Sequence, residues 1–470
     1  MKNISVVPQI YNKDSSKVFS SLHRCADAIW LDSNHKDTHG ARFDIISGFP
    51  TKTIEVQESK VFIFESNGSI KTEISDNPFT IIERFLKQLG PINSKYRHIQ
   101  FTGGFMGFFG YDHGRHLHAI ESISKKIVDL PDIRLGLYHW ALIVDHDLKE
   151  TNLIFHEDCP SLIKKDVLNI LKVPIQDTSI DGSFKLKSAF QPTISKSKYL
   201  KMVSQIKEYI LAGDCYQTNI SQHFHAQFEG DTLWAYLKLR SILPSTHAMY
   251  WSWDNKAILC LSPERYLKTS WDQSQSVINV ETKPIKGTIE RGRSKDEDMK
   301  KAITLVESTK DQAENLMIVD LLRNDISQNC KNDSVRVPKL FEIESFPNVH
   351  HLVSTVTGEL EKKKSIVDLL RDSFPGGSIT GAPKKRSMEI IDELEPLRRG
   401  VYCGSMGYIS SNDNMDLNIA IRTVTASNSK LHIWGGGGIT NDSDPNAEYK
   451  ESITKVKILM DALESAKTTL

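Results

Sequence analysis

A chain of 470 residues is too long for one compact core of ordinary size, and its 39% hydrophobic and 25% charged residues are typical of a folded globular protein. With 59 basic and 59 acidic residues the formal net charge is zero, so no overall field favours nucleic acid or a membrane surface as a partner. No segment approaches the roughly 18 apolar residues of a membrane span. The start of the chain also lacks the apolar core of a signal peptide, so we expect a cytoplasmic protein.

The amino-terminal part, to about residue 175, alternates short apolar runs with turn residues, as at 60–65 and 140–146, which is typical of strands. A stretch rich in Ser, Asp and Lys, residues 176–198, has no helical period and is the best candidate boundary. We therefore divide the chain into residues 1–190 and 191–470. The polar clusters typical of a functional site lie almost wholly in the second part.

After this boundary the pattern predicts a helix through Met202, Ile206 and Ile210, followed by strands near 257–261 and 276–280. No internal repeat is found. The elements in this part are longer than those that precede them.

Two predicted helices carry paired acids. The first spans 310–322 without a helix breaker, and Asp311 and Glu314 are three residues apart on one of its faces. The second begins at an Asp-Pro pair, 444–445, in which the aspartate is a typical N-cap and the proline suits the first helical position. One stripe of this second helix carries Glu448, Glu451 and Lys455.

Like charges three residues apart repel by a few tenths of a kcal/mol, so each acid pair favours a neutralising partner. A hard dication would supply it, because Mg²⁺ prefers oxygen ligands and is usually held by one or two carboxylates together with an anionic substrate. The six cysteines show no CxxC spacing, which argues against a zinc site. For either pair taken alone, a solvated helix face is the more common explanation.

Two glycine-rich segments offer unobstructed backbone N–H groups to an anion. Residues 373–384 precede a helical pattern, and the four glycines 435–438 follow the strand-like run 431–434. Neither segment has the spacing of a P-loop or of a dinucleotide-binding turn. Tight turns without a ligand remain open for both.

Lys286 lies between Pro284 and Gly287 at the end of a strand-like run. An isolated lysine is ordinarily a surface charge. If this one is enclosed, loss of solvent or a neighbouring cation would lower its pKa and make the amine a nucleophile.

Taken in order, these segments resemble the chorismate-utilising enzymes, which include anthranilate, aminodeoxychorismate, isochorismate and salicylate synthases. The resemblance is dense from about residue 198 to the end and extends to the amino-terminal part at 41–44 and 103–112. The matching runs are GDCYQ at 213–217, LSPER at 261–265, PIKGT at 284–288, AENLMIVDLLRND at 313–325, FPGGSITGAPK at 374–384, IRT at 421–423 and AEYKES at 447–452.

The resemblance implies a large α/β (α+β) fold in which antiparallel sheets face each other, helices lie outside and two subdomains are interleaved. It implies that Glu314 and Glu451 hold Mg²⁺ with support from Asp311 and Glu448, and that Glu264 is the general acid for the leaving C4 hydroxyl. The residues expected to hold the substrate carboxylates are Arg422, Tyr408, Lys455 and the backbone of Gly436, Gly437 and Gly438. His351 and Thr380 are expected to orient the ring.

Two positions distinguish the members of the family. Isochorismate and salicylate synthases have a water-activating lysine where this chain has Gln217, which cannot act as a base. Anthranilate synthases have a small residue where this chain has Lys286, which leaves C2 of chorismate open to ammonia. The combination of Gln217 and Lys286 resembles aminodeoxychorismate synthases, in which the lysine attacks C2 while the hydroxyl leaves and ammonia then enters at C4.

No glutaminase segment with a Gly-x-Cys-x-Gly setting is present, so the resemblance implies a separate glutamine amidotransferase subunit that supplies ammonia. The product would then serve 4-aminobenzoate and folate synthesis. Residues 31–33 resemble the family segment that contacts tryptophan, which makes Ser33 a candidate ligand in the amino-terminal region; an ordinary turn residue is the open alternative. Anthranilate synthase is the main rival activity, and a catalytically inactive binding paralogue is the rival from another class.

Overall fold

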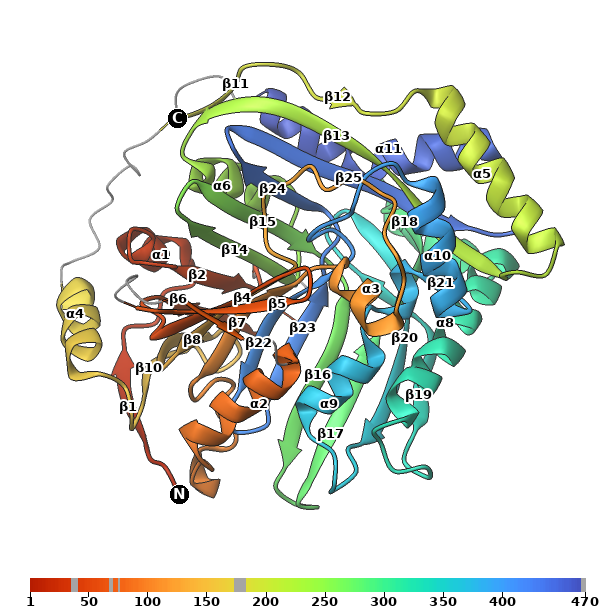
Figure 1. The fold of residues 1–470 in the computed structure, drawn as a ribbon. Helices are drawn as coiled ribbons and strands as arrows, with labels where there is room; N and C mark the ends of the chain where they lie inside the picture. The colour runs from red at the N-terminus through yellow and green to blue at the C-terminus, as the bar shows by residue number, and fades with distance from the viewer. Residues whose placement is uncertain (35–40, 67–70, 75–76, 173–182, 466–470) are drawn as a thin grey trace.

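The structure is a computed structural model that describes residues 1–34, 41–66, 71–74, 77–172 and 183–465 (Figure 1). Two large sheets dominate it, and the strand pairs within each sheet are antiparallel. The fold class predicted from the sequence, facing antiparallel sheets with helices outside, is confirmed.

The first sheet has thirteen strands among the described residues and follows the order β1-β10-β9-β3-β2-β14-β15-β24-β25-β13-β11, with β12 and β21 pairing with β13. Its strands are β1 (Ile4–Gln9), β2 (Ile29–Asp32), β3 (Phe43–Ser47), β9 (Trp140–Asp145), β10 (Glu150–His156), β11 (Phe184–Leu186), β12 (Gln191–Pro192), β13 (Gln217–Gly230), β14 (His247–Trp253), β15 (Lys256–Ser262), β21 (Gly381–Ala382), β24 (Thr423–Ser427) and β25 (Lys430–Ile439).

The second sheet has twelve strands in the same part of the chain, in the order β18-β20-β17-β16-β23-β22-β7-β8-β4-β5-β6, and β19 pairs with β20. Its strands are β4 (Lys52–Gln57), β5 (Lys60–Glu65), β6 (Lys71–Ile74), β7 (Gly104–Phe109), β8 (Ile133–Tyr138), β16 (Arg265–Asp272), β17 (Val277–Lys283), β18 (Ile285–Glu290), β19 (Arg336–Ser345), β20 (Val349–Glu359), β22 (Ser405–Ser410) and β23 (Met415–Ile419).

The two sheets pack face to face over one large apolar core. Phe108 on β7 lies edge-on to Trp251 on β14 with ring centroids 6.2 Å apart, and both side chains are fully buried. Burying such aromatic side chains is worth on the order of 2–3 kcal/mol each. The contact fixes the spacing between the sheets, and therefore the spacing of the groups that each sheet presents.

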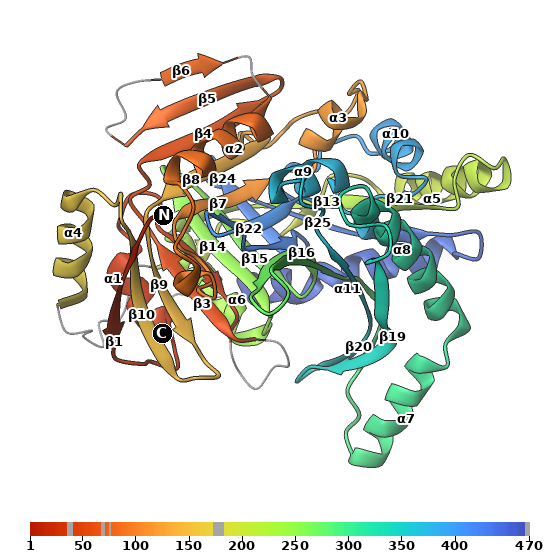
Figure 2. The same cartoon turned by 90° about the horizontal axis from the view of Figure 1, so that it is seen from below.

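Helices cover the outer faces of the sheets (Figures 1 and 2). Helices α5 and α11 pack against each other and over β13 and β25, whereas α8 lies against β18 and β20. In Figure 2, α7 projects beyond β19 and β20. The helices are α1 (Ser16–Leu22), α2 (Pro78–Leu89), α3 (His113–His118), α4 (Ser161–Lys172), α5 (Lys196–Leu211), α6 (Thr232–Ile242), α7 (Lys295–Val306), α8 (Thr309–Ser327), α9 (Ile366–Ser373), α10 (Lys384–Leu394) and α11 (Pro445–Glu464), with 3₁₀ turns η1 (Ser94–Tyr96) and η2 (Gly377–Ile379).

Within the described ranges, no helix has the length and apolar character that crossing a membrane requires.

Strands from both sides of residue 190 pair within each sheet. In the first sheet β2 pairs with β14, and in the second β7 pairs with β22. The two parts of the chain are therefore interwoven in space, and the division into 1–190 and 191–470 stays a prediction about sequence regions. Of the predicted boundary segment 176–198, residues 176–182 lie outside the described residues, and the remainder contributes β11, β12 and the start of α5.

One local prediction is wrong. We expected the four glycines 435–438 to form a loop after a strand, but β25 runs through them to Ile439 and pairs with β13 along their whole length. Glycines suit this strand because neighbouring backbone approaches too closely for side chains: a Cβ at Gly435 would lie 2.2 Å from the Ser452 carbonyl oxygen, and one at Gly436 would lie 2.4 Å from that of Ile220.

Candidate active site

The chain passes from one sheet to the other at Glu264. Strand β15 of the first sheet ends at Ser262 and β16 of the second begins at Arg265, so Glu264 lies in the crossing. The Ser262 hydroxyl accepts a hydrogen bond from the Glu264 N–H (3.2 Å), and the Glu264 carbonyl accepts one from the Ile419 N–H (3.0 Å). These backbone contacts hold a side chain that is only 5% exposed.

The Glu264 carboxyl faces Lys286 of strand β18. Burial raises the pKa of Glu264 to about 7, although the Ser378 hydroxyl and the Lys286 ammonium both favour its charged form. Burial also lowers the pKa of the half-buried Lys286, an effect that Glu314 opposes and Lys455 adds to. A carboxyl that keeps its proton near neutrality and an amine that loses its proton more easily therefore lie together, as a general acid and a nucleophile require.

Helix α8 brings its two acids to this lysine. Ser308 caps the helix by accepting from the Asp311 N–H (3.3 Å). A Cβ at Gly287, the residue after Lys286, would lie 3.0 Å from the Asp311 carboxyl carbon. One turn further on, Glu314 lies 3.8 Å from the Lys310 ammonium, and burial raises the pKa of Glu314.

Helix α11 brings the second acid pair. Asp444 accepts from the Ala447 N–H (2.8 Å) as N-cap and Pro445 is the first helical residue, as the sequence predicts. Glu448 is buried and accepts a hydrogen bond from Ser443 (2.7 Å). The Glu451 carboxylate lies 2.7 Å from the Lys455 ammonium, whose charge lowers the pKa of Glu451.

The acid pair of α11 lies beside Gly437, and its charge reaches the acid pair of α8. A Cβ at Gly437 would lie 3.4 Å from a Glu448 oxygen and 3.7 Å from a Glu451 oxygen, and the charge of Glu451 acts on Glu314 by raising its pKa. Carboxylate oxygens are the donors that Mg²⁺ prefers, so these residues fit the dication chemically. Within the described ranges no three potential ligands are gathered at one point, and Glu314, Glu448 and Glu451 each have a local partner.

Gln217 begins β13 and is fully buried, yet neither end of its side-chain amide has a hydrogen-bond partner among the described residues. A Cβ at Gly438 would lie 2.6 Å from its Nε2 atom. A buried amide without partners is costly unless a ligand or water meets it. Gln217 and the face of β25 at Gly438 therefore form one polar wall of the site.

Arg422 and His351 form another wall. Burial lowers the pKa of Arg422, and the charge of Glu264 opposes this effect. Within the described structure no hydrogen bond or ion pair engages the Arg422 guanidinium, which leaves its paired N–H donors available to an anion. Burial and the neighbouring Arg422 lower the pKa of His351 to about 3, and its Nδ1 lies 2.8 Å from the Thr288 hydroxyl, so this imidazole is neutral near pH 7.

Lys455 joins the acids to the glycine strand, because its ammonium donates to the Gly436 carbonyl oxygen (3.0 Å) as well as to Glu451. In all, the structure brings together most of the predicted residues. They are Lys286, Glu264, Asp311, Glu314, Glu448, Glu451, Lys455, Arg422, His351, Gln217 and Gly436 to Gly438.

Two predicted residues, Thr380 and Tyr408, direct their hydroxyl groups to residues outside the predicted site. Thr380 donates to the Gly376 carbonyl oxygen (3.0 Å), within the loop that bears η2. Tyr408 donates to Gln100 (3.3 Å) and stacks edge-on against Phe101, and it makes no hydrogen bond to the other predicted residues in the part of the chain described. The structure therefore does not bring Tyr408 to the site, because strand alternation turns it toward the core of the second sheet.

Ser33 directly follows β2 of the first sheet, where its hydroxyl and N–H both donate to Asp44 (2.7 Å each). Asp44 is buried, and its other oxygen lies 2.9 Å from His146. The tryptophan contact expected of Ser33 stays a prediction.

Sequence reasoning missed two residues beside the site. The Ser378 hydroxyl acts on the Glu264 carboxyl, and Lys310 acts on Glu314, Glu448 and Glu451. Ser378 lies in the glycine-rich run 374–384 that the sequence did single out, so position in that run was the available signal. Lys310 precedes the acid pair by one residue and carries no comparable signal.

The family follows from a comparison with known proteins. A family model described as chorismate binding enzyme matches residues 27–461. The chain belongs to this family. A chorismate-utilising enzyme accounts for a site that combines an unpaired arginine, a neutral histidine, a buried acid and a half-buried lysine.

Individual relatives refine the comparison. The chain is 40% identical to aminodeoxychorismate synthase component 1 of Escherichia coli (strain K12) over 469 residues, which cover 99% of this chain and 100% of the relative. It is 32% identical to anthranilate synthase component 1 of Acetivibrio thermocellus over 99% of this chain and 97% of that one. Among solved structures, anthranilate synthase component I from Streptococcus pneumoniae TIGR4 superposes with a TM-score of 0.77 at 30% identity, covering 97% of this chain and 99% of that one.

Proposed function

We propose that this chain is the chorismate-aminating component of an aminodeoxychorismate synthase, which replaces the C4 hydroxyl of chorismate by an amino group. The observation that carries the proposal is the position of Lys286: its amine, with a lowered pKa, lies half-buried between the Glu264 carboxyl and the acids of α8 and α11. The 40% identity to relatives with this name, against 32% to the anthranilate synthase relative, supports the same choice.

The proposed reaction has two steps. The neutral Lys286 amine attacks C2 of chorismate, both ring double bonds shift, and the C4 hydroxyl takes the Glu264 proton and leaves as water. Ammonia then adds at C4, both double bonds shift back and the bond from C2 to Lys286 breaks, which releases the neutral lysine amine. The new C4 ammonium returns one proton to Glu264, and the product is 4-amino-4-deoxychorismate without loss of pyruvate. The Lys286 amine is then free for the next turnover.

Anion contacts would orient the substrate for this attack. Arg422 and Lys455 present cations to its carboxylates, and the Gly436 to Gly438 backbone leaves room for close approach. The neutral His351 can face the ring without a second positive charge.

We assign Mg²⁺ to the carboxylates of Glu314 and Glu451, with Asp311 and Glu448 in support. When bound, the ion would neutralise the ring carboxylate and polarise it. The ion would compete for these carboxylates with Lys310, Ser443 and Lys455, which contact Glu314, Glu448 and Glu451 in the structure.

Ammonia would come from a glutamine amidotransferase subunit as heterodimer partner, in keeping with the designation component 1 of the relatives. We further infer that the enzyme works in the cytoplasm and that a separate lyase converts its product to 4-aminobenzoate for folate synthesis. Tryptophan at Ser33 belongs to the same proposal.

The test is Lys286→Ala, assayed with chorismate, Mg²⁺ and ammonium. We expect the enzyme-substrate adduct seen by mass spectrometry in the wild type to disappear together with formation of aminodeoxychorismate. Lys283→Ala is the matched control, because Lys283 lies three residues away at the end of the preceding strand β17 and pairs with Glu344 instead. An adduct that persists in Lys286→Ala contradicts the mechanism, and prompt anthranilate with pyruvate from the wild type would show that the anthranilate synthase alternative is correct.

A further inference from the structure

A buried ion pair lies beneath the site, and none of the roles above uses it. Arg399 is 1% exposed and Glu395 is 4% exposed. The guanidinium meets the carboxylate through two bonds, from Nε to Oε2 (2.9 Å) and from Nη2 to Oε1 (2.7 Å). This bidentate geometry fixes the plane of the guanidinium and so the direction of its remaining donors.

Those remaining donors reach two other segments of the chain. Nη1 donates to the Ile379 carbonyl oxygen (3.0 Å) at the end of η2, and Nη2 donates to the Asn219 carbonyl oxygen (3.1 Å) on β13. Glu395 in turn accepts from the N–H and the hydroxyl of Ser221 (2.7 and 2.8 Å). The pair therefore ties the end of α10 to η2 and to the strand that begins with Gln217.

The turn η2 carries Ser378, directly before Ile379. The Ser378 side chain is buried and its hydroxyl acts on the Glu264 carboxyl. The same turn packs on α8 so closely that a Cβ at Gly377 would lie 2.5 Å from Leu321. A shift of η2 would therefore move Ser378 relative to Glu264.

We propose that Arg399 is a positioning residue, which through the Ile379 carbonyl holds η2 so that the Ser378 hydroxyl stays against the Glu264 carboxyl. This inference rests on the proposed function only for the role of Glu264 as the acid. A lysine at 399 could keep one bond to Glu395, but a single ammonium cannot reproduce the planar fork that also reaches Ile379 and Asn219.

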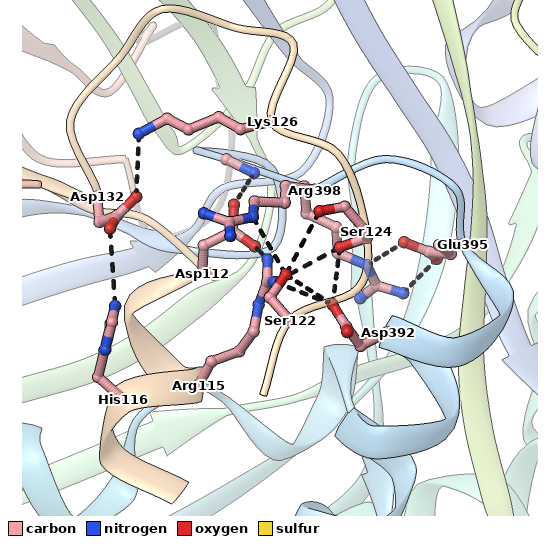
Figure 3. A network of polar contacts seen from close by, with 12 residues as sticks. Asp112, Arg115, His116, Ser122, Ser124, Lys126, Asp132, Asp392, Glu395 and Arg398 are labelled. Carbon is pink, nitrogen blue, oxygen red and sulfur yellow. Dashed lines mark hydrogen bonds and ion pairs between the residues drawn. The ribbon is translucent and has the colours of Figure 1, made fainter. Parts of the chain in front are cut away.

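Arg115, which Figure 3 shows in the same region as Glu395, offers a matched control. Arg115 is also buried and pairs with Asp112 and with Asp392 (2.9 Å) at the same end of α10. Its other contacts are with Ser122 and Ser124, and not with η2. Arg115→Lys therefore weakens a comparable buried ion pair without touching the turn that carries Ser378.

The experiment compares Ser378→Ala, Arg399→Lys, their double variant and Arg115→Lys in the full chain with chorismate, Mg²⁺ and ammonium. The readouts are the pH dependence of kcat/KM, the separate values of kcat and KM, and the urea midpoint of unfolding. We expect Ser378→Ala and Arg399→Lys to move the alkaline limb of the profile to higher pH, because the Ser378 hydroxyl favours the charged form of Glu264. The first variant removes that hydroxyl, and the second displaces it.

Both variants should also lower kcat about tenfold or more, as small misplacements of a catalytic group do, while KM for chorismate changes less than threefold. The double variant should be no worse than the worse single one, because both act on one contact. Arg115→Lys should lower the urea midpoint without moving the pH profile. If Arg399→Lys does not fold, Glu395→Gln is the substitute, because it weakens the same ion pair with a side chain of equal size. It should move the alkaline limb of the pH profile in the same direction.

The inference is overturned if Ser378→Ala leaves the profile in place, if the effects of Ser378→Ala and Arg399→Lys simply add, or if Arg399→Lys behaves as Arg115→Lys does. Failure of the proposed function would look different: the wild type would form another product. The profile would still report on Glu264 in that case, since any loss of the C4 hydroxyl needs an acid.

Discussion

Alanine substitutions along the glycine strand test the acid site most directly. At Gly437 an added Cβ would meet a Glu448 oxygen and the Lys455 nitrogen at 3.4 Å each and a Glu451 oxygen at 3.7 Å, all ordinary van der Waals distances. Its φ lies outside the left-handed region, so the backbone accepts alanine. We expect the free energy of unfolding of Gly437→Ala to stay within about 1 kcal/mol of the wild type, since alanine also restricts the unfolded chain.

The same methyl fills the space between the carboxylates and should lower Mg²⁺ affinity at least tenfold, which is about 1.4 kcal/mol. Gly435→Ala is the matched control. Its Cβ would lie 2.2 Å from the Ser452 carbonyl oxygen, so strand and helix must move apart. Overpacking of this kind costs about 1–3 kcal/mol.

Urea unfolding without metal and isothermal titration with Mg²⁺ separate the two effects. Gly437→Ala should unfold near the wild-type midpoint but bind Mg²⁺ weakly, whereas Gly435→Ala should show a lower midpoint. The reasoning is refuted if Gly437→Ala binds Mg²⁺ as the wild type does, or if it loses as much stability as Gly435→Ala.

Two further predictions concern charge. The folded-state pKa of Glu264, about 7, lies above its ordinary value of 4.5, so its stability contribution is fully present below pH 4.5 and is lost as pH rises to about 7. In urea titrations, Glu264→Gln should therefore unfold like the wild type at pH 4 but be more stable than it at pH 8 by up to about 3 kcal/mol. The variant should also lose turnover. Equal stability of the two proteins at pH 8 would contradict the raised pKa. Arg422→Lys should raise KM for chorismate about tenfold by removing a bidentate contact to a carboxylate, and an unchanged KM would show that Arg422 does not hold the substrate.

Local sequence patterns predicted the two acid-bearing helices well. Asp444 and Pro445 begin α11 as their capping chemistry requires, and α8 runs without a breaker through Asp311 and Glu314. These features depend on hydrogen bonds and spacings within a few residues. The glycines 435–438 misled the local analysis, because their place inside β25 depends on β13 and α11, which lie far away in the sequence.

The candidate site also combines features that the sequence predicted with features that depend on distant segments. Resemblance supplied a list of residues, but Tyr408 faces Gln100 and the core, while Ser378 reaches Glu264 without having been expected. Which side of a strand a residue faces depends on the register of its pairing, and a shift of one residue reverses it.

By itself, the sequence determined that two helices would each present acids on one face. It placed Lys286 at the end of a strand, whereas Lys286 is the second residue of β18. The comparison of Gln217 with the water-activating lysine of related synthases came from resemblance and stays a prediction. Only the tertiary structure decided that Lys286 is half-buried and lies against Glu264, at the point where the chain crosses between sheets. Burial is a property of everything packed around a group, and it is burial that shifts the pKa of an acid and of an amine in the directions their proposed chemistry needs.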